Sequence, residues 1–359
     1  MVTIIIALML MLTAISCWLT GMTLRYALRN NMIDQPNERS SHCRPIPRGG
    51  GAAFSILIIG VLLLLLGLLP EFSGIWIAMA GGSVLVAVIG WLDDRKGLPV
   101  VPRSVVHVIA ASWAVYWLGG LASIDLGFAN LHLGMLGSGL AILAIVWSVN
   151  LFNFMDGIDG LAATQTVVVG AIAGLLCWIT GHNVLALCIW IMGAVVGGFL
   201  PWNWSPARIF MGDCGSGLLG FLIGTVAIAS EKLGAVSILT WCILMGVFLV
   251  DATATLLRRV YKGERWYEAH CSHAYQRAVQ AGLSHSRVVA LVVLINLLLG
   301  AMAVATLFVP VLLVPVALGA CVGLLLLWHR VGRLKPGHFE ATDSFGDHQA
   351  GVPLLSRAA

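Results

Sequence analysis

Long apolar runs alternate with short polar segments along almost the whole chain. A run of about 20 apolar residues can cross a lipid bilayer as an α-helix, and eleven segments approach or exceed this length. They are Val2–Leu24, Ala52–Leu69, Ile75–Leu92, Arg103–Leu118, Met135–Asn150, Ala162–Thr180, Val184–Leu200, Ser216–Ser230, Gly234–Leu257, Val288–Leu307 and Val309–His329. The pattern predicts an all-α, polytopic integral membrane protein with about eleven transmembrane helices. Residues 1–330 form the predicted transmembrane domain, and residues 331–359 form a polar tail that we expect to be flexible.

Positive charge is distributed unequally between the two sides of the predicted bundle. With eleven helices, all of the 20 lysines and arginines except Lys232 fall on one side. Cytoplasmic loops of membrane proteins carry the excess of lysine and arginine, so this side is predicted to be cytoplasmic. The N-terminus then lies outside, and the C-terminus with its tail lies in the cytoplasm.

Acidic and histidine side chains gather in four polar clusters, although the chain is 59% hydrophobic and only 10% charged. The clusters are Trp91–Gly97, Asn150–Gly160, Phe210–Ser216 and His270–Arg277. A charge at the bilayer centre costs about 2.5–3.5 kcal/mol on insertion scales, which favours carboxylates only where they meet water, metal or polar substrate. All four clusters fall on the predicted cytoplasmic side, which indicates an active site on that face of the membrane. The net charge of +4 follows from the topology and gives no support to nucleic-acid binding.

The second cluster places polar side chains at every third residue, namely Asn150, Asn153, Asp156 and Asp159. On a helix or its terminal turn, this spacing keeps side chains near one face. We therefore expect two carboxylates and two amides to converge near the cytoplasmic surface. The alternative is that these residues only cap the end of a helix.

The other acidic motifs suggest two different tasks. Asp93 and Asp94 end a predicted helix, and adjacent helical residues point about 100° apart, so the two are expected to differ in role. Asp213 is expected to lie in a deformable glycine-rich loop, and a carboxylate there suits Mg²⁺, which prefers oxygen ligands and keeps waters and substrate phosphates in its shell. The alternatives are a solvated helix end for the pair and an ordinary turn residue for Asp213.

Basic and histidine residues are candidates for phosphate binding. His270, His273 and Arg277 are spaced so that they can face one way, and imidazole and guanidinium both suit phosphate. Zinc is a less favoured reading, because no standard set of cysteine or acidic ligands is near. Arg48 precedes three glycines at a predicted helix start, where it serves either an anion site or a headgroup anchor. Asp251, inside an apolar run, is either a wall of the site or a structural hydrogen-bonding group.

The order of these motifs resembles that of the polyprenyl-phosphate N-acetylhexosamine-1-phosphate transferases, which are enzymes of the glycosyltransferase family 4 type. The resemblance runs from IDQPNERSSH (Ile33–His42) to the His270 cluster, with DD, NxxNxxDGIDGLA, FMGD and a histidine-rich loop in that order. A contiguous triple histidine, which marks the muramoyl-pentapeptide branch, is missing from the sequence. HCSHAYQR and RSSHCRPIPRGGG are most similar to the bacterial branch that initiates O-antigen synthesis.

The resemblance implies that a lipid phosphate, undecaprenyl phosphate, attacks the sugar-linked phosphorus of a UDP-N-acetylamino sugar and releases UMP. It also implies a bacterial inner-membrane enzyme that needs Mg²⁺, with Mn²⁺ as an alternative, and that has membrane lipid but no nucleic acid as a partner. We predict that the catalytic residues are Asp93, Asp94, Asp156 and Asp159. We predict that Asp213 and Asn153 bind the metal ion. The predicted substrate contacts are Arg48, Asn150, Asn153, His270, His273 and Arg277.

The main alternative function is an ion- or proton-coupled transporter. Transporters usually place ionisable groups near the membrane midplane and often have repeated halves, whereas here the acidic residues lie at one face and no repeat is evident. A non-catalytic scaffold would leave the four clusters unexplained. Release of UMP from a UDP-sugar would separate the enzyme from both alternatives.

Overall fold

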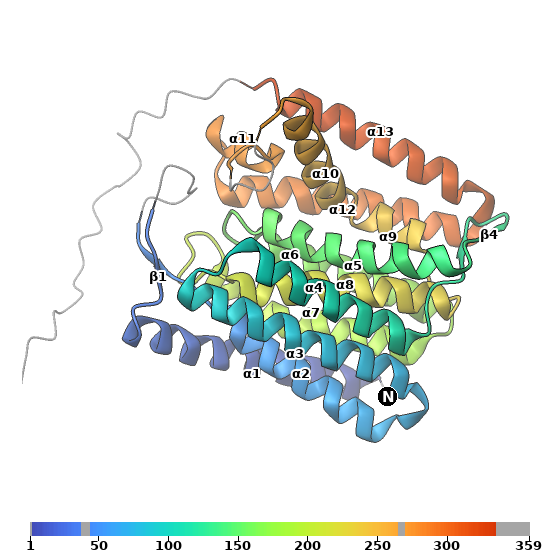
Figure 1. Cartoon of the computed structure of the whole chain (residues 1–359), viewed down its shortest axis with the longest axis horizontal. Coiled ribbons are helices and arrows are strands. Elements are labelled where there is room, and N and C mark those ends of the chain that lie inside the picture. Colours follow the sequence, from blue (N-terminus) through green and yellow to red (C-terminus); the bar gives the residue numbers. More distant parts are fainter. Residues whose placement is uncertain (1, 37–43, 265–269, 335–359) are drawn as a thin grey trace, which may run out of the picture.

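The computed structural model describes residues 2–36, 44–264 and 270–334, and these residues form a bundle of long helices (Figure 1). The helices are α1 (Val2–Arg29), α2 (Gly51–Leu68), α3 (Ser73–Lys96), α4 (Val100–Leu118), α5 (Met135–Met155), α6 (Leu161–Ile179), α7 (Asn183–Asn203), α8 (Asp213–Lys232), α9 (Ile238–Leu244), α10 (Gly246–Tyr261), α11 (Ala274–Gln280), α12 (His285–Phe308) and α13 (Leu313–Val331). Two short 3₁₀ helices, Pro70–Phe72 and Pro310–Leu312, precede α3 and α13. The predicted tail from residue 335 onward lies outside the described residues.

Each of the eleven predicted segments is helical, and the all-α, membrane-spanning fold is confirmed. Within the described ranges, nine helices are long and apolar enough to cross a membrane, and the bent pair α9–α10 makes a tenth candidate. Helix α4 is not among them. It nevertheless packs along α3 and α5, and it carries Arg103 and His107, whose polarity lowers its mean hydropathy.

The segment predicted as one helix at Gly234–Leu257 is two helices that meet at Met245 with a bend of 82°. The prediction of a single straight helix was therefore wrong. A break leaves backbone groups without helical partners, and such a break is tolerated at membrane depth only where protein surrounds it. Met245 is 7% exposed, and a buried amide pair lies beside it: Asn296 donates to Gln165 at 2.6 Å, and Gln165 contacts the Met245 sulfur at 3.8 Å.

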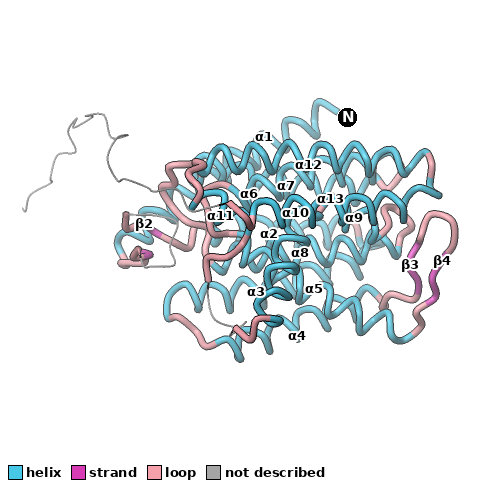
Figure 2. Tube along the Cα trace, turned by 90° about the horizontal axis from the view of Figure 1, so that it is seen from above, coloured by secondary structure: helices cyan, strands magenta, loops and turns pink. Residues whose placement is uncertain are grey.

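Two short antiparallel strand pairs, which the sequence did not predict, mark the opposite ends of the bundle (Figure 2). At one end, β1 (Ile33–Asp34) pairs with β2 (Ile46–Pro47). At the other end, β3 (Ser123–Asp125) pairs with β4 (Asn130–His132). The hairpin of β3 and β4 is tied to the bundle because the Asp125 backbone N–H donates to Glu231 at 2.7 Å.

Helix α8 lies at the centre of the bundle. In its most apolar 18-residue window, 89% of the residues are buried, compared with 17% in α1 and in α13. It packs against α2, α3 and α5, and its approach to α2 is so close that a Cβ on Gly51 would lie 2.3 Å from the Cα of Gly215. The N-terminus of this enclosed helix, Asp213, lies at the end of the bundle that carries β1 and β2.

Candidate active site

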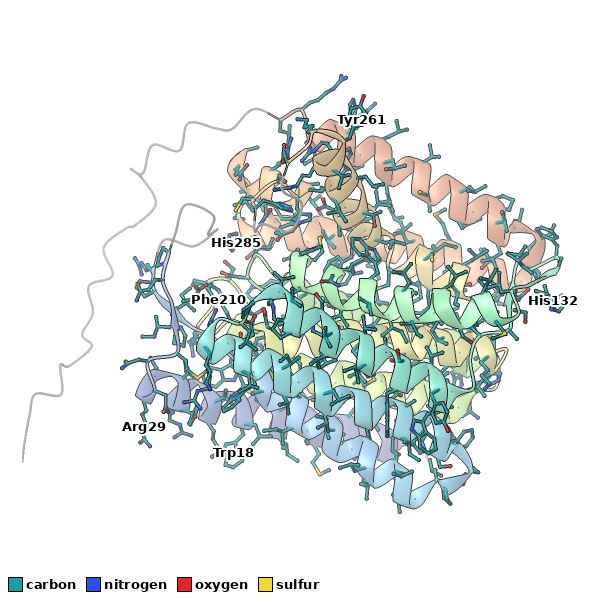
Figure 3. The ribbon with its side chains drawn as sticks, in the orientation of Figure 1. Trp18, Arg29, His132, Phe210, Tyr261 and His285 are labelled. Carbon is teal, nitrogen blue, oxygen red and sulfur yellow. The ribbon has the colours of Figure 1, made fainter. Side chains whose placement is uncertain are left out.

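A cavity of about 270 Å³ opens at this end of the bundle. All four sequence clusters contribute to its lining, together with β1, the segment before α2, the end of α7 and the start of α12. The lining residues are Asp34, Arg48, Asp94, Asn153, Asp156, Gly157, Ile158, Asp159, Asn203, Phe210, Gly212, Asp213, Gln276 and His285. Figure 3 shows Phe210 and His285 at this end and His132 of β4 at the other. Backbone hydrogen bonds fix the loop before α8, because Phe210 donates to Pro47 at 2.8 Å and accepts from Gly50 at 2.9 Å.

Asp94 holds the N-terminus of α8. Its carboxylate accepts hydrogen bonds from the backbone N–H groups of Asp213 at 2.9 Å and Cys214 at 3.1 Å. The first N–H groups of a helix have no partner within the helix, so a carboxylate there also interacts favourably with the helix dipole. Gly212 makes the approach feasible: its φ is +75°, and a Cβ would lie 2.5 Å from an Asp94 oxygen.

Asp93 contacts a different partner from Asp94, as expected for two adjacent residues on a helix. One Nη1 atom of Arg103 lies 2.5 Å from Asp93 and 2.6 Å from Asp213, so it bridges the two carboxylates. Asp93 also accepts the backbone N–H of Leu98, and it does not line the cavity. Sequence reasoning missed Arg103, although an arginine at the start of an apolar run was an available signal.

Asp213 is the first residue of α8 and not part of a deformable loop, so the predicted loop position was wrong. The flanking glycines permit close packing, and the capping interaction with Asp94 begins the helix three residues earlier than its apolar pattern does. Its side chain lines the cavity.

The polar residues spaced three apart, Asn150, Asn153, Asp156 and Asp159, do not all face the cavity, and they separate at the end of α5. Asn153 lines the cavity and accepts a hydrogen bond from Ser216 at 3.2 Å, and Asp156 follows the last helical residue. Burial, together with the charges of Asp213, Asp94 and Asp159, raises the pKa of Asp156 well above its usual value. Asn150 is not in the lining, because its amide donates to Val146 of its own helix at 2.8 Å.

Asp159 forms a pair with His285, a residue that sequence reasoning did not consider. The Nδ1 atom of His285 lies 3.3 Å from Asp159 Oδ2, and the same oxygen accepts the Ala207 N–H at 3.1 Å. Burial alone would raise the pKa of Asp159, but His285 and the Ala207 N–H outweigh it and lower that pKa. Asn203, also missed, accepts from Gly160 at 3.0 Å and donates to Ile209 at 3.1 Å, which positions this turn against the loop that leads to α8.

The histidine cluster lies beside the cavity rather than in it. His273 is buried with Nδ1 3.6 Å from Asp251, and Arg277 donates to Ser272 and Gly332. His270 is half-buried; burial and then His273 lower its pKa to about 4. Neither histidine nor Arg277 lines the cavity; from this cluster only Gln276 does.

Asp251 explains how that cluster is held. Its two oxygens accept the N–H groups of Ala274 at 2.8 Å and Tyr275 at 3.2 Å, so it caps α11 from α10. Tyr275 in turn donates to the Phe154 carbonyl at 2.8 Å. Of the two alternatives left open by the sequence, these contacts favour the structural one.

Arg48 lies where the cavity meets the end of α3. It donates to the carbonyls of Asp94 at 2.9 Å and Asp93 at 3.4 Å, where a cation also interacts favourably with the helix C-terminus. Arg48 therefore both lines the cavity and fixes the backbone of the two aspartates.

The cavity offers carboxylate and amide oxygens, which are ligands that suit Mg²⁺. In the described parts of the chain, no group of three or more His, Cys, Asp or Glu side chains is arranged to hold a metal ion. Mg²⁺ usually takes one or two carboxylates and completes its shell with waters and substrate phosphates. Asp213 and Asn153 offer oxygen ligands in one cavity, and the accumulation of carboxylates that disfavours ionisation of Asp156 would be relieved by a cation. These residues fit the ion.

The chain is similar to known glycosyltransferases over most of its length. Residues 76–231, which include Asp93, Asn153 and Asp213, match the model of glycosyl transferase family 4. The chain is 31% identical over 291 residues to a Bacillus subtilis protein described as a probable undecaprenyl-phosphate N-acetylglucosaminyl 1-phosphate transferase, covering 77% of this chain and 78% of the relative. It is 32% identical over 320 residues, 78% of this chain and 76% of the relative, to a Mycolicibacterium smegmatis decaprenyl-phosphate N-acetylglucosaminephosphotransferase. An Escherichia coli K12 undecaprenyl-phosphate alpha-N-acetylglucosaminyl 1-phosphate transferase is 28% identical over 78% of both chains.

Proposed function

This chain belongs to glycosyl transferase family 4, and we propose that it transfers an N-acetylamino-sugar 1-phosphate from a UDP-sugar to undecaprenyl phosphate and releases UMP. One observation carries the proposal: Asp94, Asp156 and Asp213, which are far apart in the sequence, meet in a single cavity at one end of a membrane-spanning bundle. The named activities of the relatives support N-acetylglucosamine as the sugar.

Phosphoryl transfer requires positioning of the two phosphates and neutralisation of their charge more than it requires covalent help from the protein. Asp213 and Asn153 would hold Mg²⁺, or Mn²⁺ in its place, and the bound ion would neutralise charge on the UDP-sugar diphosphate. Asp94 and Gly212 fix the backbone that presents Asp213.

The lipid phosphate needs orientation rather than a strong base. The second pKa of a phosphate monoester is about 6, so this group is largely ionised at neutral pH. Asp93 is linked to the cavity by Arg103, because the Arg103 guanidinium contacts both Asp93 and the cavity residue Asp213. In this proposal Asp93 is a positioning residue, and Arg103 is the cation that it directs toward the acceptor phosphate.

The proposed biological setting is the first membrane step of a lipid-linked polysaccharide such as an O-antigen, in a bacterial inner membrane. The cavity is proposed to face the cytoplasm, where UDP-sugars are found, with the N-terminus outside. A transporter is the weaker candidate, because the carboxylates gather at one end of the bundle and not near its midplane.

The test is a panel of UDP-sugars presented to purified protein with undecaprenyl phosphate and Mg²⁺. We expect UMP and a polyprenyl-diphosphate sugar to form in equal amounts with at least one UDP-N-acetylamino sugar. Omitting the lipid phosphate should abolish UMP release, which separates transfer from simple hydrolysis. If no UDP-sugar yields lipid-linked product under these conditions, the proposal is wrong.

A further inference from the structure

The cavity contains many more acidic than basic groups. Five of its lining residues are aspartates, and the side chains in the lining that can carry positive charge are Arg48 and His285. Arg48 is engaged with the carbonyls at the end of α3, next to Asp94. His285 contacts Asp159. A substrate with two phosphates therefore meets a second candidate donor at His285.

The contacts of His285 orient its ring. Nδ1 lies 3.3 Å from Asp159 Oδ2 and 3.4 Å from the backbone nitrogen of Asp159. Nδ1 accepts the Asp159 N–H, which a ring protonated at Nδ1 could not do, so the proton of the neutral ring lies on Nε2. In the imidazolium, Nδ1–H instead donates to the Asp159 carboxylate. In both arrangements Nε2 carries a proton, and Nε2 has no hydrogen-bond partner among the residues that the structure describes.

The position of the ring is set by its helix. His285 is the first residue of α12, and Ser284 caps this helix by accepting the Arg287 N–H at 3.4 Å. The ring side chain is 14% exposed, and it lines the cavity together with Asp159 and Gln276. A ring held by one nitrogen against a carboxylate, with the other nitrogen directed to solvent in a cavity, has the geometry of a ligand contact.

We propose that Nε2–H of His285 donates a hydrogen bond to the phosphate that leaves as UMP, with Asp159 as its positioning residue. The inference rests on the proposed function. The acceptor oxygen forms a bond to the sugar-linked phosphorus, the bond from that phosphorus to the bridging oxygen breaks, and the electron pair stays on UMP. No proton has to move, so His285 donates throughout while negative charge grows on the leaving phosphate.

The test compares how strongly UMP and uridine inhibit transfer by the full-length protein, because only UMP carries the phosphate. In His285→Asn, the side-chain amide replaces Nδ1 and keeps the contact to Asp159 but no longer reaches the cavity. We expect the preference for UMP over uridine to fall about tenfold, as for loss of a charge-assisted hydrogen bond. In His285→Gln, whose amide replaces Nε2, part of the preference should remain.

The control is His182→Gln, at the other end of the bundle, where His182 contacts the Leu233 carbonyl. This variant should keep the wild-type preference. If His285→Asn keeps it too, the ring only anchors the turn of Asp159, and the inference is wrong. If the wild-type protein shows no preference for UMP and no transfer, the proposed function fails with it.

A second measurement needs no variant. In the wild-type protein, UMP should slow the modification of His285 by diethylpyrocarbonate, measured on the His285 peptide by mass spectrometry, and uridine at equal occupancy should slow it less. Equal protection by UMP and uridine, or protection by neither, overturns the inference even if the His285 variants fail to fold.

Discussion

Each carboxylate of the cavity has a different local partner, and the partner decides what the carboxylate can do. Asp94 accepts two backbone N–H groups and is fully engaged at the start of α8. Asp93 and Asp213 share one atom of Arg103, and Asp159 contacts His285. Among the residues that the structure describes, Asp156 has no ion pair, and the charges that raise its pKa are those of Asp213, Asp94 and Asp159.

Removing the charge of Asp213 should affect metal use before it affects folding. We expect Asp213→Asn to lower kcat by about a hundredfold or more at limiting Mg²⁺, because the carboxylate that compensates the ion is lost. The thermal unfolding temperature should stay near that of the wild type, since Arg103 keeps Asp93 as a partner. Near-normal turnover of this variant across an Mg²⁺ titration would exclude Asp213 from the metal role.

Asp156 should give the opposite balance between stability and activity. The pKa of Asp156 is higher in the folded protein than in the unfolded chain, so the protonated form of Asp156 favours folding. This contribution to stability is complete below the pKa of the unfolded chain and is lost as pH rises through the folded-state pKa. We expect Asp156→Asn to unfold about 2 °C or more above the wild type at pH 8 without metal, while transfer activity falls sharply.

The measurement is thermal unfolding of both proteins in detergent at pH 5 and pH 8, with and without Mg²⁺. The difference between them should shrink at pH 5, because the raised pKa lets Asp156 bind its proton more fully there than at pH 8. It should also shrink with Mg²⁺ if the ion binds in this cavity. A stability difference that is the same at both pH values would contradict the raised pKa.

At the residue scale, the sequence predicts which carboxylates lie at the cavity better than it predicts their partners. Asn153, Asp156, Asp159 and Asp213 share the cavity as their spacing and membrane side suggested. Arg103 and His285 were missed because each lies in or beside an apolar segment and gains its meaning from a residue distant in the sequence. Asn150 was included by periodicity, but a helix turns its polar amide to its own backbone just as readily.

Helix ends, rather than helix faces, build the site. The starts of α8 and α11 are both capped by a carboxylate from another helix, Asp94 and Asp251 respectively. Such long-range caps were not predictable, because sequence rules identify caps from neighbouring residues. The same limit applies to the break at Met245, where the apolar pattern continues without interruption and only the buried amides beside it mark the bend.

The close approach of α3 and α8 gives a prediction at this scale. Gly212→Ala adds a Cβ that would lie 2.5 Å from the Asp94 carboxylate, so the start of α8 and Asp213 must shift. We expect transfer activity to fall at least tenfold, because an error of about 1 Å in a catalytic group can cost up to a hundredfold.

Gly234→Ala is the matched control for this change. Gly234 also has a positive φ, +69°, but a Cβ there meets nothing within 4 Å. Both variants place an alanine at a positive φ, and only Gly212→Ala adds the steric conflict with Asp94. Similar activities for the two variants would show that the contact between Asp94 and Gly212 does not control the site.

At the scale of the whole molecule, the apolar pattern predicted the architecture well, because about 20 apolar residues leave a chain in lipid few structures other than a helix. The helix order also explains why clusters separated by pairs of crossings meet at one end: α4 and α5 return the chain from Asp94 to Asp156, and α6 and α7 return it to Asp213. Helix α4 is needed to bring Asp94 and Asp156 to the same end, although it is too polar to be counted as a span by composition alone.

The orientation of the bundle is the prediction on which the proposed function depends. Glu231 accepts the Asp125 N–H at one end, whereas Ala207 donates to Asp159 at the cavity. In a variant without native cysteines, single cysteines near Ser123 and Glu231 should react with a membrane-impermeant maleimide added outside intact cells. Cysteines near Lys96, Ala207 and Glu264 should react only after permeabilisation, because the positive-inside rule places them with the cytoplasmic lysines and arginines. The two groups serve as controls for each other, and outside labelling at any position of the second group would place the cavity away from the cytoplasmic pool of UDP-sugars.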